Sequence, residues 1–159
     1  MSKNKDKTNV MRLLEQKNIE YIPHKFETDN TLTGRDVAKI IKKDENSVFK
    51  TLVTIGKSGK NYVFVIPVNK ELNLKLAAEA SGEKSIHMIP SKELLGLTGY
   101  IHGGCSPIGM KKTFPTFFDE EINKHEIITF SAGKVGYQVE LNTSDLSKII
   151  EFKIANLAE

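Results

Sequence analysis

The stretch FKTLVTIGKSGKNYVFVIPV, residues 49–68, contains the clearest fold signal in the chain. Two runs rich in β-branched and aromatic residues flank a short turn, KSGK, at residues 57–60. Runs of this kind on either side of a glycine-containing turn are typical of a β-hairpin. We therefore predict that residues 49–55 pair with residues 62–68.

Two helices with N-terminal capping signals are predicted before this hairpin. Thr8 can cap a first helix, and Thr33, with Asp36 three positions later, forms a variant of the capping box at the start of a second. Apolar residues at helical spacing predict the buried faces, which carry Val10, Met11, Leu13 and Leu14 in the first helix and Val37, Ile40 and Ile41 in the second.

Short strands and helices are predicted over the rest of the chain. Strands and helices intermingle without a strict βα alternation, and several strand pairs have short links. We therefore expect an α+β fold with a central mixed sheet that is strongly curved or barrel-like and is flanked by short helices. We predict further strands at 21–26, 85–89, 115–119, 126–133 and 137–141, and further helices at 73–82, closed by Gly82, at 91–96, capped by Ser91, and at 142–150.

The chain has 159 residues, a single cysteine and a net charge of +3. This length fits one domain, and we predict a flexible polar tail at 1–8 followed by one domain at 9–159. One cysteine excludes an internal disulfide and fits a reducing compartment, so a cytoplasmic protein is expected. The apolar runs are too short to span a membrane, and the N-terminus lacks the apolar stretch of a secretory signal.

A second distinctive stretch, GYIHGGCSPIGMKK at 99–112, holds the single cysteine. Cys105 could be a nucleophile with His102 as its base, which would require a lowered thiol pKa and a fixed geometry. Nothing in the sequence fixes that geometry, so the alternative is a small side chain that lines a loop. These two residues also fall short of the three or four protein ligands that zinc needs, and we expect no metal.

Gly103 and Gly104 indicate a different chemistry in the same loop. Because glycine has no Cβ atom, a ligand can approach the backbone closely, and the N–H groups can hold an oxyanion or a carbonyl oxygen. The alternative is a tight connection that needs unusual backbone angles. Lys50, at the start of the hairpin, also has two interpretations: it can point into a pocket and meet a phosphate or carboxylate, or extend to solvent.

Four stretches taken in order resemble the YbaK/ProRS-associated editing-domain family, and within it the free-standing Cys-tRNA(Pro)/Cys-tRNA(Cys) deacylases. They are FKTLV at 49–53, TGYIHGGCSPIGMKK at 98–112, FSAGKVGYQVEL at 130–141 and DLSKII at 145–150. The resemblance covers nearly the whole chain. It implies an α+β unit around a curved mixed sheet that releases a wrong amino acid from tRNA.

The resemblance also implies the residues of the site. Lys50 matches the family's pocket lysine near the tRNA 3′ end, and Gly103 and Gly104 match the loop that holds the aminoacyl carbonyl, so we predict these three as catalytic. The predicted substrate-binding residues are Phe26, Thr51, Tyr100, Ser106, Pro107, Ser131 and Gly133. The chain departs from relatives at three positions: Cys105 replaces an aliphatic residue, and Phe26 and Gln138 stand where some relatives have tyrosine and an acidic residue.

The predicted function is trans-editing deacylation of an aminoacyl-tRNA. Backbone amides would polarise the ester carbonyl, and the resemblance implies that the thiol of a mischarged cysteine attacks it and leaves as a cyclic thiolactone. We expect no cofactor; the expected partners are the 3′ end of an aminoacyl-tRNA and a prolyl-tRNA synthetase. Two alternatives remain open: a hydrolase of Ala-tRNA(Pro) that uses water, and a non-catalytic module that binds aminoacyl-tRNA or the synthetase.

Overall fold

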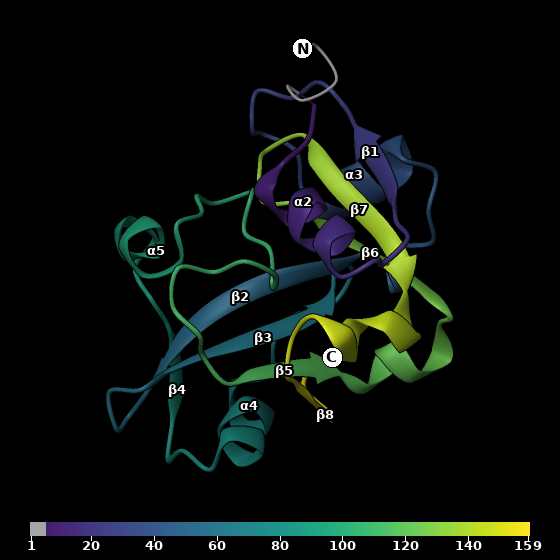
Figure 1. Cartoon of the computed structure of the whole chain (residues 1–159). Helices are drawn as coiled ribbons and strands as arrows, with labels where there is room; N and C mark the ends of the chain where they lie inside the picture. The colour runs from purple at the N-terminus through teal and green to yellow at the C-terminus, as the bar shows by residue number, and fades with distance from the viewer. Residues whose placement is uncertain (1–5) are drawn as a thin grey trace.

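The computed structural model describes residues 6–159, which form two β-sheets flanked by short helices (Figure 1). One sheet has five strands in the order β4-β2-β3-β5-β8, and the other has three in the order β1-β7-β6. This arrangement confirms the predicted α+β class. A single barrel-like sheet is not found in the described part of the chain, because only one isolated bridge, between Val48 and Thr129, links the two sheets.

Strands β2 (Phe49–Gly56) and β3 (Asn61–Pro67) form the predicted hairpin. They pair antiparallel, from Phe49 opposite Pro67 to Ile55 opposite Asn61, which confirms the predicted pairing. Strand β3 is the middle strand of its sheet, and residues 63–66 have 0% exposure. Such a continuous apolar run is expected for a strand that is covered on both faces.

Three further strands complete the five-stranded sheet. Strand β4 (Ile86–Met88) pairs antiparallel with β2, while β5 (Thr116–Asp119) and β8 (Lys153–Ala155) extend the sheet in parallel from β3. Helix α4 (Leu74–Ser81) buries Ala77 and Ala78 against Phe64 and Ile66 of β3. Asn73 caps this helix, and Gly82 ends it in the left-handed conformation, as predicted.

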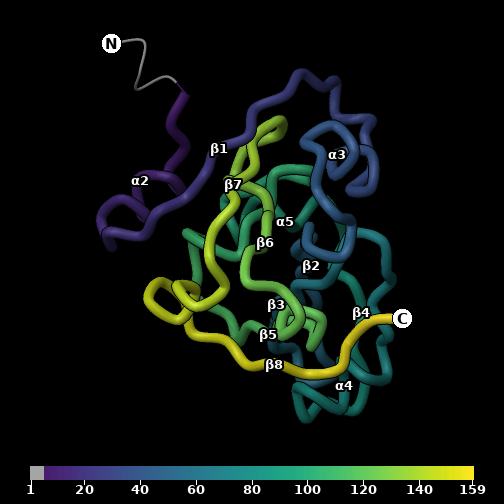
Figure 2. Tube along the Cα trace, turned by 90° about the vertical axis from the view of Figure 1, so that its right-hand side faces the viewer, coloured from purple at the N-terminus to yellow at the C-terminus, as the bar shows by residue number. Residues whose placement is uncertain are grey.

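The three-stranded sheet is antiparallel, with β7 (Tyr137–Asn142) between β1 (Ile22–Lys25) and β6 (Ile127–Ser131). Helix α2 (Asn9–Gln16) lies beside this sheet (Figure 2), and the Thr8 side chain accepts a hydrogen bond from the Met11 amide, which confirms the predicted cap. The main hydrophobic core contains residues of both sheets and of α2, including Val10, Leu14, Phe49, Val53, Val63, Phe130 and Val139.

Helix α3 (Gly34–Ile40) begins with the predicted capping box, and of its predicted stripe Val37 and Ile41 are partly buried, with Ile41 packed against the end of the hairpin. Ala38 is its buried residue and packs with Val48 and Val68 at the end of the hairpin. Ile40 is 46% exposed, so its place in the predicted buried stripe is wrong. The small Ala38 side chain lets α3 approach the hairpin closely, and this contact decides which face is buried.

Two other helix predictions need correction. Pro90, not Ser91, occupies the cap position of α5 (Ser91–Thr98), and no side chain caps it. The last predicted helix is a 3₁₀ helix, η3 (Thr143–Lys148), and the Asn142 side chain makes no capping hydrogen bond. The sequence did not predict the other two 3₁₀ helices, η1 (Glu45–Ser47) and η2 (Glu120–Lys124), or strand β8.

The predicted tail at 1–8 is described only in part, since residues 1–5 lie outside the described residues. Asp6 forms an ion pair with Lys25 at 2.8 Å, and Lys7 forms one with Glu15 at 3.0 Å. Within residues 6–159, no helix has the length and apolar character needed to cross a membrane.

Tyr100 connects two loops from inside the core. Its hydroxyl donates a hydrogen bond to the carbonyl of Ile108. Its ring lies against Gly133, where a Cβ atom would come within 2.9 Å of the ring carbon Cε1. Gly133 also has a φ of +91°, which favours glycine. The position therefore requires glycine for its backbone conformation and for its contact with Tyr100.

Replacing Gly133 with alanine should destabilise the fold more than the same change at Gly59, which also has a φ of +91° but has nothing within 4 Å of a Cβ. We expect Gly59→Ala to lower the free energy of unfolding by about 1 kcal/mol through left-handed strain. Gly133→Ala should lower it by roughly 2–4 kcal/mol, because overlap with Tyr100 adds to the strain. Urea denaturation of both variants measures this difference. Equal losses of unfolding free energy in the two variants would contradict the importance of the Tyr100 contact.

Candidate active site

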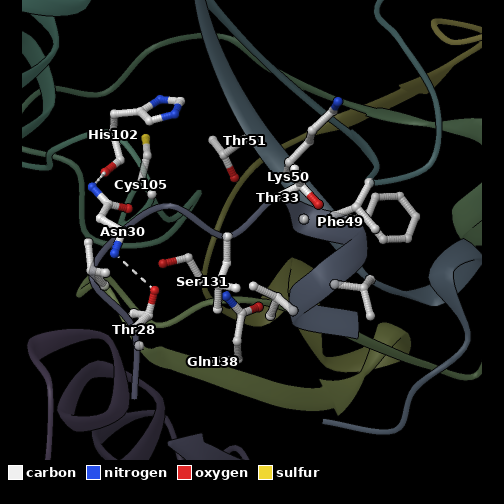
Figure 3. Close-up of a pocket in the computed structure, with 18 of the residues that line it drawn as sticks. Thr28, Asn30, Thr33, Phe49, Lys50, Thr51, His102, Cys105, Ser131 and Gln138 are labelled. Carbon is white, nitrogen blue, oxygen red and sulfur yellow. Dashed lines mark hydrogen bonds between the residues drawn. The ribbon is translucent and has the colours of Figure 1, made fainter. Parts of the chain in front are cut away.

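A cavity of about 360 Å³ lies beside the bridge that joins the two sheets. Its lining comes from residues within 26–37, from the start of β2 at 48–52, from His102, Gly103 and Cys105, from residues within 131–138, and from Val68 and Leu94. Side chains from these separate regions converge on the central space (Figure 3). The volume is in the range of small-molecule binding sites.

The structure brings half of the predicted site residues together. Phe26, Lys50, Thr51, Gly103 and Ser131 line the cavity. The residues outside its lining are Tyr100, Gly104, Ser106, Pro107 and Gly133. The second group supports the loop: Tyr100 holds the Ile108 carbonyl, and the buried Ser106 hydroxyl accepts a hydrogen bond from the Ile108 amide. Pro107 faces a separate groove.

The two adjacent glycines have different roles. The Gly104 amide donates a hydrogen bond to the Ile101 carbonyl at 2.9 Å, so it is not available to a ligand. Gly103 has a φ of +87°, and its N–H has no acceptor among residues 6–159. Asn30 lies so close that a Cβ at Gly103 would be 2.3 Å from Oδ1, and its Nδ2 donates to the His102 carbonyl at 3.2 Å. Asn30 thus fixes the turn that leaves the Gly103 amide free.

Lys50 stands at the rim of the cavity. In Figure 3 its amine points away from Thr51 and Gln138, as expected for a residue whose neighbour in the strand faces the opposite side. The Nζ atom lies 4.0 Å from the Glu71 carboxylate, and the two side chains are 30% and 89% exposed. Exposed pairs of this kind contribute little stability, so the amine can change partners at low cost.

Two polar atoms in the cavity lining are buried without a hydrogen-bond partner. They are Thr51 Oγ1 and Gln138 Oε1. Leaving such a group unpaired typically costs about 1–3 kcal/mol. Two such groups in one cavity can be paired by ordered water or by the polar atoms of a bound ligand.

Sequence reasoning missed the role of Asn30 and did not place Gln138 in the site. Asn30 lies in a polar stretch, and its φ of +70° is compatible with asparagine in a turn. Nothing local indicates that it contacts a loop 72 residues further along the chain. The alternation in β7 could have placed Gln138 on the face of Glu140, but only tertiary packing shows that Gln138 lines the cavity.

Cys105 lines the cavity, but its environment suppresses nucleophilic reactivity. Burial raises the pKa of its thiol to about 12. His102 is exposed, and no hydrogen bond joins the two side chains within residues 6–159. The structure therefore favours the interpretation of Cys105 as a lining residue. Among these residues, no group of three or more His, Cys, Asp or Glu side chains could hold a metal ion.

Glu140 anchors the wall of the cavity next to Gln138. Its carboxylate is 6% exposed and contacts Nε2 of His24 and Nζ of Lys43, both at 2.8 Å. Burial acts to raise the pKa of Glu140, but the hydrogen bonds from Lys43 and His24 outweigh it and the pKa is lowered. Because Lys43 follows α3 and His24 lies in β1, this cluster joins the helix that borders the cavity to the three-stranded sheet.

The protein is therefore an α+β domain with a compact cavity. A glycine amide without a protein acceptor lies at the cavity wall, and two unpaired polar atoms lie inside it. Residues 28–149 match the model of the aminoacyl-tRNA editing domain family. The chain belongs to this family.

The chain is also similar to individual proteins. It is 46% identical over 140 residues to an Enterococcus faecalis protein named "Putative Cys-tRNA(Pro)/Cys-tRNA(Cys) deacylase EbsC", covering 87% of this chain and 85% of that one. Hypothetical protein APE2540 has a similar crystal structure, with a TM-score of 0.86, 21% identity and coverage of 96% and 100%. A structure described as a "putative trans-editing enzyme for prolyl tRNA synthetase" has a TM-score of 0.80, 21% identity and coverage of 96% and 98%. At these identities, the two structures show the fold alone.

Alkylation of Cys105 by iodoacetamide should be slow in the folded protein. A pKa of about 12, against an ordinary value of 9.0, leaves a smaller thiolate fraction at pH 8, roughly a thousandfold less. Mass spectrometry of the labelled protein gives the rate, and the chain unfolded in urea provides the control. Labelling at the same rate in the folded and unfolded chain would contradict this account of the thiol.

Glu140→Gln should make stability less dependent on pH under acidic conditions. Because the folded-state pKa of Glu140 is lowered, its stabilisation is complete above the unfolded pKa, about 4.3, and is lost as the pH falls through the folded value. Urea unfolding between pH 7 and pH 3 should show a flatter profile in the variant and, at pH 7, a loss of about 1–3 kcal/mol. The exposed Glu20→Gln variant is the control; identical profiles for Glu140→Gln and wild type would contradict the ion cluster.

Proposed function

We propose that this chain is a trans-editing aminoacyl-tRNA deacylase that releases mischarged cysteine from tRNA(Pro), with Cys-tRNA(Cys) as a second substrate. The observation that carries the proposal is the unpaired Gly103 amide in the lining of a 360 Å³ cavity. Membership of the editing-domain family and 46% identity to a relative named for these substrates support it. Such an enzyme would act in the cytoplasm, and a prolyl-tRNA synthetase partner remains an expectation from the sequence.

The proposed reaction uses the substrate's own nucleophile. The carbonyl oxygen of the ester accepts a hydrogen bond from Gly103, which stabilises negative charge as the carbonyl is attacked. The cysteinyl sulfur bonds to the carbonyl carbon, the ester C–O bond breaks, and the thiol proton passes to the ribose oxygen. The products are a cyclic thiolactone and free tRNA. A chain whose own thiol has a raised pKa fits this reaction, because no protein nucleophile is required.

Lys50 would hold the tRNA 3′ end at the rim. Its amine is partly exposed and has only a distant contact with the exposed Glu71 carboxylate. A phosphate or ribose oxygen at the mouth of the cavity would give it a stronger partner. In this proposal the lysine positions the substrate while Gly103 polarises the carbonyl.

Lys50→Ala should reduce release of labelled cysteine from Cys-tRNA(Pro) by about 10–100-fold, the effect of losing one charged hydrogen bond. Lys57→Ala, in the exposed turn of the hairpin, is the matched control and should retain wild-type turnover. Cys105→Ala should also turn over the substrate, since the thiol of Cys105 takes no part in the proposed reaction. Unchanged turnover in Lys50→Ala, or abolished turnover in Cys105→Ala, would contradict the mechanism.

The same assay with Ala-tRNA(Pro) tests the substrate. The proposed mechanism predicts far slower release of alanine, because its side chain carries no thiol. Faster release of alanine would indicate a hydrolase that activates water. Binding of Cys-tRNA(Pro) without any turnover would indicate a non-catalytic module, and either result would overturn the proposal.

A further inference from the structure

We propose that Gln138, Thr51 and Ser131 form a subsite for the free α-ammonium group of the aminoacyl moiety. This inference rests on the proposed function and assigns one part of the substrate to one end of the cavity. Of the three residues, Gln138 supplies the strongest observation, because it is only 9% exposed and its Oε1 has no hydrogen-bond partner.

The three side chains come from both sheets and meet at the cavity. Ser131 of β6 lies directly opposite Gln138 of β7 in the antiparallel ladder, so their side chains are neighbours on one face. Thr51 comes from β2 in the other sheet. Figure 3 shows the Thr51 hydroxyl directed toward the region where Ser131 and Gln138 lie. All three line the cavity.

The chemistry of these groups favours a ligand with several donors. Gln138 Oε1 is an acceptor, and the Thr51 and Ser131 hydroxyls can also accept. Ser131 Oγ already accepts a hydrogen bond from the Gly133 amide at 3.1 Å, which fixes its place. An ammonium group offers three N–H donors, which suits a lining whose free polar groups are acceptors. A thiol or a methyl group would leave at least one of them unpaired.

The electrostatic surroundings agree with a cation at this position. The nearest ionised group on the same face of β7 is Glu140, two residues from Gln138, and its charge is shared between His24 and Lys43. The Lys50 amine points away from the three oxygens. A positively charged ligand at these oxygens therefore meets acceptors, while the amine of Lys50, a cation of the cavity lining, is directed away from them.

The subsite implies that the protein discriminates aminoacyl esters from N-blocked ones. Isothermal titration calorimetry would compare 3′-(L-alanylamino)-3′-deoxyadenosine, an unreactive amide mimic of a charged 3′ end, with its N-acetyl derivative. Wild type should bind the free amine at least tenfold more tightly. Gln138→Met, which keeps the size and removes the acceptor, should lose about 10–100-fold in affinity for the amine only. Gln138→Glu should retain it, and the exposed Gln16→Met is the control.

Three results would overturn the subsite: equal binding of both compounds, no binding of either, or unchanged affinity in Gln138→Met. Deacylation of Cys-tRNA(Pro) and of its N-acetyl form separates this inference from the proposed function. Equal turnover of the two substrates would contradict the subsite without contradicting the proposed function. If neither substrate is turned over but calorimetry shows a preference for the amine compound, the proposed function is contradicted and the subsite is supported.

Discussion

Strand β2 packs against a hydrophobic core on each of its two faces, and this constraint organises the molecule. Phe49 and Val53 pack into the core between the sheets, while Leu52, on the other face, packs against the core beneath α4. The residue before the strand, Val48, makes an isolated bridge to Thr129 of the other sheet. The cavity lies beside this bridge, so the same strand that holds the two cores together also supplies Lys50 at the rim and Thr51 in the interior.

Local signals were sufficient to predict the hairpin, most strands and three helix caps. The alternating and apolar runs around residues 57–60 carry enough information for the β2–β3 pairing. The division into two sheets could not be predicted, because it depends on Val48 meeting Thr129, which is 81 positions away in the sequence. Likewise, the helical pattern of α3 suggested that Ile40 is buried, but contact with the hairpin selected Ala38. Tertiary packing decided each of these cases.

Prediction of the candidate site from the sequence was also limited, because the roles of single atoms depend on tertiary packing. The sequence indicated that the loop glycines matter, and the resemblance added the lysine and the surrounding positions. It could not show that the Gly104 amide is used inside the turn while the Gly103 amide is free. The resemblance also predicted that Tyr100 binds the substrate. In the structure Tyr100 is buried, with its ring against Gly133 and its hydroxyl bonded to the Ile108 carbonyl. The cavity has three chemically distinct parts: a cationic rim, an unpaired backbone amide and an end with unpaired acceptors.

The central claim is that these three parts hold one aminoacyl ester in one orientation. A crystal structure with an unreactive amide-linked aminoacyl adenosine tests this claim most directly. The account predicts the carbonyl oxygen within hydrogen-bond distance of the Gly103 N–H, with the adenosine leading out past Lys50. Density for the ligand only in the separate groove beside Pro107, or in the cavity with its carbonyl directed away from Gly103, would contradict it.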